Sequence, residues 1–284
     1  MNRAFCTIAL IWASLAGPAL AAPACPFTPD ASVPIGYDRD DGRPKITVQM
    51  NGKDEFLVVD TGAPISLIKD SVADELKLPL KPYPRTYTSV AGISPSAIAT
   101  VDTLSVGALT GHELSFFLVP SVQIPPPLAG SFGADFLQGW DVDFDFGKDL
   151  INFISSEKCG GDPVYWTKRP YVSLPLRLGD DLHLRATVAL DGKEVTAVLD
   201  TGSAGSLIGL ALAAQLFDIR DAGEHTFRSL AFNGVSIDNP TMFVADGTRF
   251  TGNELLIGMP VLKQLHLYVS YQSKTAYLTR ADAR

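Results

Sequence analysis

Two aspartates carry the chemistry that this 284-residue sequence offers. Each follows an apolar pair and precedes Thr-Gly, in Val58-Val59-Asp60-Thr61-Gly62 and Val198-Leu199-Asp200-Thr201-Gly202. Two carboxyl groups held close together cannot both ionise, so they share a proton, and one acts as a base while the other acts as an acid. Such a pair can activate a water molecule for attack on an amide carbonyl and then protonate the leaving nitrogen.

The two motifs belong to an internal repeat, which is why we expect folding to bring them together. Residues 47–68 and 187–208 align without a gap at an offset of 140, and 11 of the 22 positions are identical. A second match pairs residues 132–137 with residues 257–262. The sequence therefore predicts two duplicated lobes, residues 32–155 and 171–284, related by a pseudo-two-fold axis and joined by a linker over residues 156–170.

The pattern of each half predicts an all-β fold class, mostly β with short helices. Short runs rich in Val and Thr alternate apolar with polar residues, and Asn51-Gly52 and Asp191-Gly192 are strong hairpin signals. We expect helices over residues 67–78 and 206–217. A hairpin over about residues 88–102 is expected in the first half alone, because the second half is shorter at that point.

The first residues are typical of an export signal. Arg3 precedes an apolar stretch over residues 4–16, and Ala19-Leu20-Ala21 offers a cleavage site. We expect residues 1–21 to be a signal peptide cleaved near Ala21, and the mature chain to be periplasmic or secreted, without a membrane span. An uncleaved anchor or a buried helix is the alternative. After cleavage Cys25 and Cys159 remain, and export favours a disulfide between them over two free thiols.

Composition argues against several other classes. Lys and Arg number 23 against 31 Asp and Glu, for a net charge of −8 and no basic run, which argues against nucleic-acid binding. Four His and three Cys are too scattered for a Cys/His metal cluster. Alternate aspartates at 141, 143 and 145 are expected to form one solvated strand face rather than a calcium loop. No metal and no cofactor are expected.

The repeated Asp-Thr-Gly motifs, each followed by an apolar-Gly motif, resemble those of the aspartic proteases. The flanking sequence is similar to the retropepsin-like (retroviral-type) branch found in exported bacterial proteins, although both lobes here lie in one chain, as in pepsin. The resemblance implies that Asp60 and Asp200 are the catalytic pair. It also implies loop-supporting and substrate-binding residues: Thr61 and Thr201 as cross-linking hydroxyls, Gly62 and Gly202 as donors to the carboxylates, Gly133 and Gly258 in the turns beneath, and a flap over residues 87–93 with Tyr87 and Gly92.

The two motifs differ at the next residue, which is Ala63 in the first and Ser203 in the second. We expect the Ser203 hydroxyl to donate to the outer oxygen of Asp200 and to stabilise its ionised form. Since Ala63 offers no such donor, the shared proton should reside mainly on Asp60. Ser66 and Ser206 are expected to be helix caps or loop anchors rather than nucleophiles.

The expected function is that of an exported, monomeric aspartic endopeptidase that acts on polypeptide substrates. Two alternatives stay open. The chain could be a catalytically silent binding or inhibitor-like protein that keeps the fold, or its lobes could pair in trans with those of a second chain. A single flap argues against pairing in trans.

Overall fold

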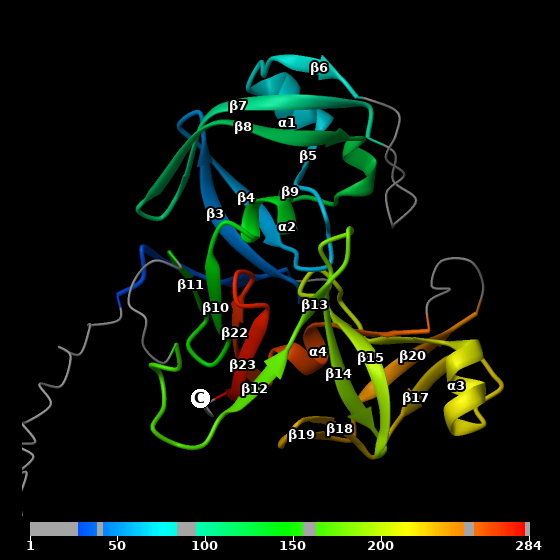
Figure 1. The fold of residues 1–284 in the computed structure, drawn as a ribbon. Helices are drawn as coiled ribbons and strands as arrows, with labels where there is room; N and C mark the ends of the chain where they lie inside the picture. Colours follow the sequence, from blue (N-terminus) through cyan, green and yellow to red (C-terminus); the bar gives the residue numbers. More distant parts are fainter. Residues whose placement is uncertain (1–27, 39–41, 84–94, 156–162, 247–252, 282–284) are drawn as a thin grey trace, which may run out of the picture.

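Strands dominate the computed structural model, which describes residues 28–38, 42–83, 95–155, 163–246 and 253–281. They form three sheets, and the helices are short. In Figure 1 one sheet of the first half lies at the top, one sheet of the second half lies at the lower right, and a third sheet, at the lower left, takes strands from both.

The first-half sheet curls toward a barrel. Its order is β2 (Gly36–Tyr37), β3 (Pro44–Met50), β4 (Lys53–Val59), β9 (Leu128–Phe132), β5 (Leu67–Lys69), β8 (Leu109–Val119), β7 (Ala97–Val106) and β6 (Leu80–Pro82). β3 also pairs with β7, where Met50 lies opposite Leu104. β3 and β4 form the predicted hairpin at Asn51-Gly52, whose φ values of 49° and 84° suit a type I′ turn. Three short helices accompany the sheet: α1 (Asp70–Glu75), η1 (Ser121–Gln123) and α2 (Ala134–Leu137).

The second-half sheet has equivalent pairings. Its order is β17 (Gly223–Thr226), β20 (Thr241–Ala245), β16 (Leu207–Gly209), β21 (Leu255–Ile257), β15 (Lys193–Leu199), β14 (Leu184–Leu190), β18 (Ser229–Phe232) and β19 (Val235–Asp238), with β13 (Arg177–Leu178) beside β14. Leu190 of β14 lies opposite Leu230 of β18, as Met50 lies opposite Leu104. Its helices are α3 (Leu210–Phe217) and α4 (Met259–Leu262).

The third sheet joins the two halves. Its order is β1 (Ala31–Pro34), β11 (Leu150–Ile154), β10 (Asp141–Asp145), β22 (Leu265–Ser270), β23 (Thr275–Arg280) and β12 (Val172–Pro175). β10 and β22 are antiparallel with Asp143 opposite Tyr268, and this is the one strand pairing between the halves in the described part of the chain. One face of these two strands, with Phe144 and Val269, is fully buried in the hydrophobic core.

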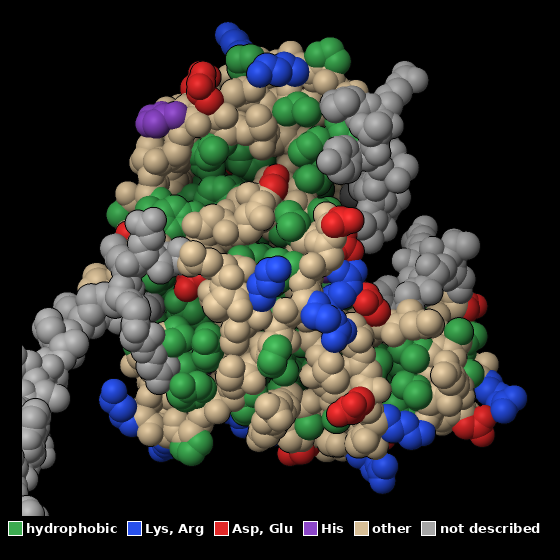
Figure 2. All heavy atoms as spheres, viewed as in Figure 1, with side chains coloured by type: hydrophobic (Ala, Val, Ile, Leu, Met, Phe, Trp, Pro, Cys, Tyr) green, Lys and Arg blue, Asp and Glu red, His purple; other side chains and the backbone are tan. Residues whose placement is uncertain are grey.

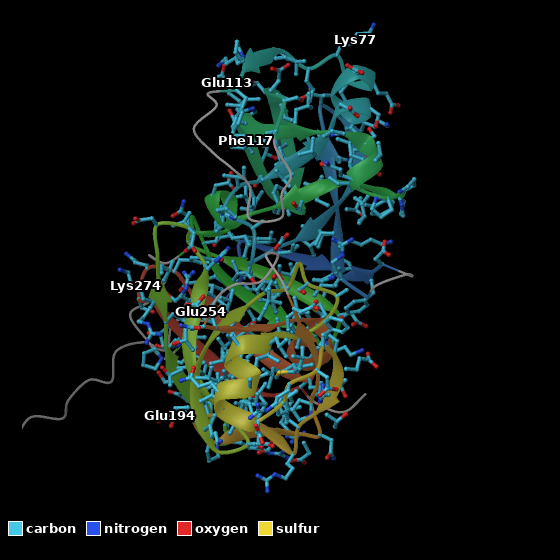
Figure 3. The ribbon with its side chains drawn as sticks, turned by 90° about the vertical axis from the view of Figure 1, so that its right-hand side faces the viewer. Lys77, Glu113, Phe117, Glu194, Glu254 and Lys274 are labelled. Carbon is cyan, nitrogen blue, oxygen red and sulfur yellow. The ribbon has the colours of Figure 1, made fainter. Side chains whose placement is uncertain are left out.

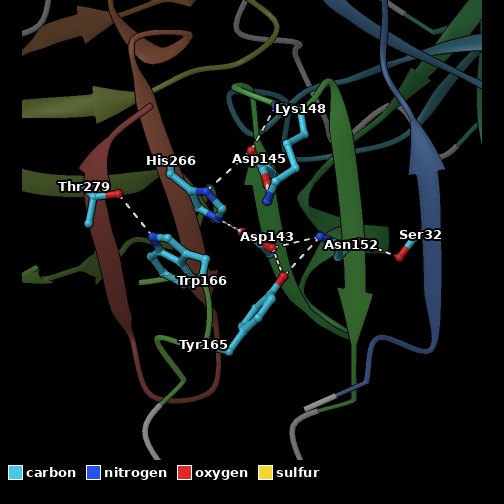
Figure 4. Close-up of polar contacts among 9 residues, drawn as sticks. All are labelled: Ser32, Asp143, Asp145, Lys148, Asn152, Tyr165, Trp166, His266 and Thr279. Atoms are coloured by element: carbon cyan, nitrogen blue, oxygen red, sulfur yellow. Dashed lines mark hydrogen bonds and ion pairs between the residues drawn. The ribbon is translucent and has the colours of Figure 1, made fainter. Parts of the chain in front are cut away.

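The opposite face of β10 and β22 corrects the expectation of a solvated aspartate row. Asp143 is 0% exposed and Asp145 is 6% exposed. Asp143 accepts hydrogen bonds from Nε2 of His266 at 2.7 Å, from Nδ2 of Asn152 at 2.8 Å and from the hydroxyl of Tyr165 (Figure 4). The expectation failed because two of these partners are distant along the chain: His266 comes from a neighbouring strand of the other half, and Tyr165 comes from the segment between the halves.

That segment covers the shared sheet through aromatic rings. The ring of Trp166 stacks on that of His266 with centroids 4.2 Å apart, and its Nε1 donates to Oγ1 of Thr279 at 3.1 Å (Figure 4). Nδ1 of His266 lies 3.5 Å from Oδ1 of Asp145. The imidazole therefore lies between two carboxylates of the first half. We name Asp143, Asp145, Asn152, Tyr165, Trp166 and His266 the seam network.

The predicted helices begin later than expected. Residues 67–69 and 207–209 are the strands β5 and β16, and α1 and α3 follow them. Leu67 pairs in parallel with Phe117, and Leu207 pairs in the same way with Phe243. Apolar spacing over so few residues fits a strand or a helix equally well, and the distant partner strand decides between them.

Some expectations fall on residues outside the described ranges: the Cys25–Cys159 bridge, the signal peptide, and the flap with Tyr87 and Gly92. Within those ranges no helix is long and apolar enough to span a membrane. The described residues also hold no group of three or more His, Cys, Asp or Glu side chains arranged to bind a metal ion.

Candidate active site

Asp60 and Asp200 lie where a strand of each half ends. The backbone N–H of Asp60 donates to the carbonyl of Phe132 at 2.9 Å, and that of Asp200 donates to the carbonyl of Ile257 at 2.9 Å. Each aspartate is thereby fixed at the end of a parallel pair, β4 with β9 and β15 with β21. Residues of high β propensity, Val and Leu, build these strands up to the aspartate, and Thr-Gly then turns the chain.

Two threonine hydroxyls cross-link the loops that carry the aspartates. The N–H of Thr61 donates to Oγ1 of Thr201 at 3.1 Å, and the N–H of Thr201 donates to Oγ1 of Thr61 at 3.0 Å. Each hydroxyl then donates across to the opposite strand, Thr61 to the carbonyl of Leu199 at 2.7 Å and Thr201 to that of Val59 at 2.6 Å. Both side chains are buried, so the exchange fixes one loop against the other in a dry environment.

The glycines of the motifs let the two carboxyl groups meet. The N–H of Gly62 donates to Oδ1 of Asp60 at 3.0 Å, and that of Gly202 donates to Oδ1 of Asp200 at 2.9 Å. A Cβ atom on Gly62 would overlap the carboxyl group of Asp200, and one on Gly202 would overlap that of Asp60. Each carboxyl therefore packs against the other loop's glycine, and the two carboxyl groups are hydrogen-bonded to each other.

A second pair of glycines supports the loops from beneath. A Cβ atom on Gly133 would lie 2.8 Å from the carbonyl oxygen of Ala63, and one on Gly258 would lie 2.7 Å from that of Ser203. The N–H of Ala134 donates to the carbonyl of Ala63 at 2.7 Å, and the N–H of Met259 donates to the carbonyl of Ser203 at 2.9 Å. The chains after β9 and β21 thus pack directly on the aspartate loops.

Ser66 and Ser206 are loop anchors. The hydroxyl of Ser66 accepts from the N–H of Gly133 at 3.0 Å and donates to Oδ1 of Asp135 at 2.6 Å. Ser206 accepts from the N–H of Gly258 at 3.1 Å. Sequence reasoning missed Asp135 as the partner of Ser66. The repeat of Ser66-Leu67-Ile68 in the second half was a signal that the serine has a role in both halves.

Burial raises the pKa of both carboxyl groups above the ordinary value of an aspartate. Loss of solvation raises the pKa of Asp60 and of Asp200, and the negative charge of Asp60 raises the pKa of Asp200 further. The N–H groups of Gly62 and Gly202 oppose this by favouring the ionised forms. Two neighbouring carboxyls whose pKa values are raised in this way are suited to share one proton, which is the condition for one base and one acid.

The expected hydrogen bond from the Ser203 hydroxyl to Asp200 is wrong. The Ser203 hydroxyl donates to the carbonyl of Gly205 at 2.8 Å, because the turn after Gly202 brings that carbonyl within reach. The positive charge of Arg43 meanwhile lowers the pKa of Asp60, and no cation acts on Asp200 in the same way among its principal partners. The asymmetry favours charge on Asp60 and the proton on Asp200. Sequence reasoning missed Arg43, which lies 17 residues before its carboxylate.

Equivalent strands of the two halves bond to the chain after each aspartate loop through their backbones. The N–H of Phe117 in β8 donates to the carbonyl of Ser66 at 2.9 Å, and that of Phe243 in β20 donates to the carbonyl of Ser206 at 2.8 Å.

Figure 3 shows Phe117 and Glu254 between Lys77 at the top of the molecule and Glu194 near its base. Acidic and basic side chains are interspersed over the face drawn in Figure 2, without a single-sign patch.

Two strand ends, two reciprocally bonded threonines and a proton-sharing carboxyl pair define an acid-protease type of site on a mostly β fold. Residues 46–136 match the family model described as aspartyl protease. That family is retropepsin-like, and the matched segment contains Asp60 and the turn at Gly133. A comparison with curated proteins gives no match.

Proposed function

We propose that the chain is an aspartic endopeptidase that hydrolyses peptide bonds through a water activated by Asp60 and Asp200. The protease-type domain over residues 46–136 supports a peptidase activity. The observation that carries the mechanism is the packing of each carboxyl group against the glycine of the opposite loop, which gives one shared proton to a buried pair.

The proposed reaction uses the two carboxyls in different protonation states. Ionised Asp60 removes a proton from water while the water oxygen attacks the peptide carbonyl carbon, and neutral Asp200 donates its proton to the carbonyl oxygen. The tetrahedral intermediate then collapses: one of its hydroxyls returns a proton to Asp200, the C–N bond breaks, and the nitrogen takes the proton held by Asp60. The proton count closes, and the pair returns to its starting charge.

Cleavage of a denatured protein mixture, with fragments identified by mass spectrometry, tests this proposal. Wild type should produce internal cleavages, and Asp60→Asn and Asp200→Asn should each lower the rate by at least about 10³-fold, because each removes the shared proton system. Near-ultraviolet circular dichroism checks that both variants stay folded. Folded wild type that cleaves nothing from pH 3 to 8 would favour the alternative of a silent binding protein.

We also propose that two lobes, residues 32–155 and 171–284, act in one exported, monomeric chain with a Cys25–Cys159 bridge. The matching strand registers of the two halves support the two-lobe division. Export and the bridge are supported by the sequence alone. Mass spectrometry of the exported protein should find a new N-terminus near Ala22 and no free thiol, and size-exclusion chromatography should give the mass of one chain.

A further inference from the structure

A cavity of about 490 Å³ lies in the first half of the molecule. The hairpin of β7 and β8 lines one side of it, and α2 with the residues that follow lines the other; in Figure 1, α2 lies below this hairpin. Neither Asp60 nor Asp200, nor any other residue of the Asp-Thr-Gly motifs, lines the cavity. Its volume is in the range of small-molecule sites in proteins.

Most of the cavity wall is apolar. Val106 and Phe116 in the wall are buried, whereas Leu109, Phe136 and Trp140 are half-buried. Hydrophobic side chains lie below the β7–β8 hairpin on the face drawn in Figure 2. Half-buried apolar side chains around a hollow lose further contact with water when the apolar body of a ligand covers them, and this favours binding.

The second half has larger side chains at equivalent positions. β7 and β8 align with β18, β19 and β20 at a constant offset of 126, because their pairings with the neighbouring strands match. At this offset Val106 corresponds to Phe232, and Gly111 corresponds to Ile237. Phe232 and Ile237 are both 0% exposed in the hydrophobic core. The fold therefore accepts larger residues at two positions where the first half has small ones beside a cavity.

One carboxylate, that of Asp135, lines the cavity. It accepts hydrogen bonds from the hydroxyl of Ser66 at 2.6 Å, from the N–H of Ser66 at 2.9 Å and from the N–H of Phe136 at 2.9 Å. All three donors are uncharged, and within the described ranges no Lys, Arg or His side chain forms an ion pair with Asp135. The residue is exposed, so its negative charge is available to a ligand.

The chain after the aspartate loop does not need this carboxylate. Ser206 accepts from the N–H of Gly258 at 3.1 Å, as Ser66 accepts from the N–H of Gly133 at 3.0 Å. The residue equivalent to Asp135, at the offset of 125 that relates residues 132–137 to residues 257–262, is Pro260. The first half therefore combines smaller side chains with an added charge in the wall of one cavity.

We propose that this cavity binds a small amphiphilic cation, whose apolar body fills the space beside Val106 and Gly111 and whose single ammonium group pairs with Asp135. Burial of the apolar body supplies the affinity. The charge pair selects the cation over neutral or anionic molecules of the same shape. This inference does not depend on the proposed function, because neither Asp60 nor Asp200 takes part.

Titration with three indoles of nearly equal size tests the proposal: tryptamine is a cation, tryptophol is neutral and indole-3-propionate is an anion. The indole N–H signal of Trp140 in ¹H–¹⁵N spectra, assigned with Trp140→Phe, reports binding. The signal of Trp166 is the internal control, because its Nε1 donates to Oγ1 of Thr279 and its ring does not line the cavity. Tryptamine should shift the Trp140 signal alone, with a dissociation constant about fivefold below that of tryptophol. Indole-3-propionate should bind more weakly than either.

Substitutions in the cavity wall separate charge from shape. Asp135→Asn should lower the affinity for tryptamine to that for tryptophol, because it removes the charge and keeps an oxygen acceptor for Ser66. Asp102→Asn is the matched control, since this exposed aspartate of β7 does not line the cavity, and it should leave the preference for tryptamine unchanged. Val106→Phe inserts the residue that the second half has at this position, so it should abolish the binding of all three indoles.

The titration of wild type decides the proposal by itself, whether or not Val106→Phe folds. A Trp140 signal that does not move at millimolar tryptamine overturns the proposal, and so does equal affinity for the three indoles. A Trp140 signal that moves with protein concentration alone also overturns it, because a second copy of the chain would then be the occupant. No step of this test measures peptide hydrolysis, so its outcome is independent of that of the cleavage experiment.

Discussion

At the scale of single residues, identical tripeptides end in different electrostatic surroundings. The repeat was enough to predict Asp60, Asp200 and the glycines, because each of these is defined by its neighbours along the chain. The direction of the Ser203 hydroxyl was not predictable, since it depends on where a turn brings the carbonyl of Gly205. The influence of Arg43 also depends on distance in space rather than along the chain.

The raised pKa of Asp200 has a consequence for stability. A carboxyl whose pKa is higher in the folded state than in the unfolded state stabilises the fold below its unfolded pKa, and this contribution is lost as the pH rises through the folded pKa. Burial and the charge of Asp60 raise this pKa. Asp200→Asn stays neutral, so its melting temperature should exceed that of wild type at pH 7, and the two should converge near pH 3. Differential scanning calorimetry at both pH values measures this.

The control for this comparison is the same substitution at an exposed aspartate. Asp102 is exposed on β7, so Asp102→Asn should melt close to wild type at both pH values. A melting temperature of wild type above that of Asp200→Asn at pH 7 would contradict the expectation. It would mean that the raised pKa of Asp200 does not lower the stability of the fold at that pH.

At the scale of elements, the site depends on how strand ends are tied together. The alternation of apolar and polar residues predicted strands, and the Asn-Gly and Asp-Gly turns predicted the hairpins that β3 forms with β4 and β14 forms with β15. The same local pattern misassigned the first residues of β5 and β16. These short strands exist because β8 and β20 lie beside them in parallel, and such long-range pairing leaves no mark in a window of ten residues.

The cross-link between the loops predicts a cost for losing one hydroxyl. Thr201→Val keeps the shape but leaves the N–H of Thr61 and the carbonyl of Val59 without their buried partner. Unfolding in urea should show a loss of about 2 to 4 kcal/mol, since two buried hydrogen bonds disappear. Thr201→Ser keeps the hydroxyl and removes one methyl group, so its loss should be near 1 kcal/mol. Equal losses in the two variants would show that packing, not the hydroxyl, matters at this position.

At the scale of the whole molecule, the two halves meet in a sheet with a polar, buried face. The alternate aspartates predicted that β10 would be a strand, but not that it would pair with β22. They therefore gave no reason to expect Asp143 beside His266, nor Tyr165 and Trp166 above them. A buried polar network of this kind cannot be found from periodicity, because an alternating polar row looks the same whether water or protein covers it.

The seam network predicts a large effect from a distant substitution. His266→Phe keeps a ring against Trp166 but removes the nitrogen that is hydrogen-bonded to Asp143 and the nitrogen that lies 3.5 Å from Asp145. We expect the free energy of unfolding to fall by roughly 3 to 5 kcal/mol, the usual cost of breaking a buried pair. Arg220→Ala, which breaks an exposed pair with Asp218, should cost less than about 1 kcal/mol. Similar costs for the two variants, measured by urea unfolding, would contradict the importance of the seam network.

The order of the shared sheet places three strands of one half beside three strands of the other, and the segment between Ile154 and Val172 connects them. A covalent connection of this length turns the meeting of two carboxyls into an intramolecular event, with an effective concentration of millimolar order or more. A site assembled from two separate chains loses its carboxyl pairs on dilution, because the chains dissociate. Here both carboxyls belong to one chain, so under the proposed function dilution should lower the rate only in proportion to the protein itself.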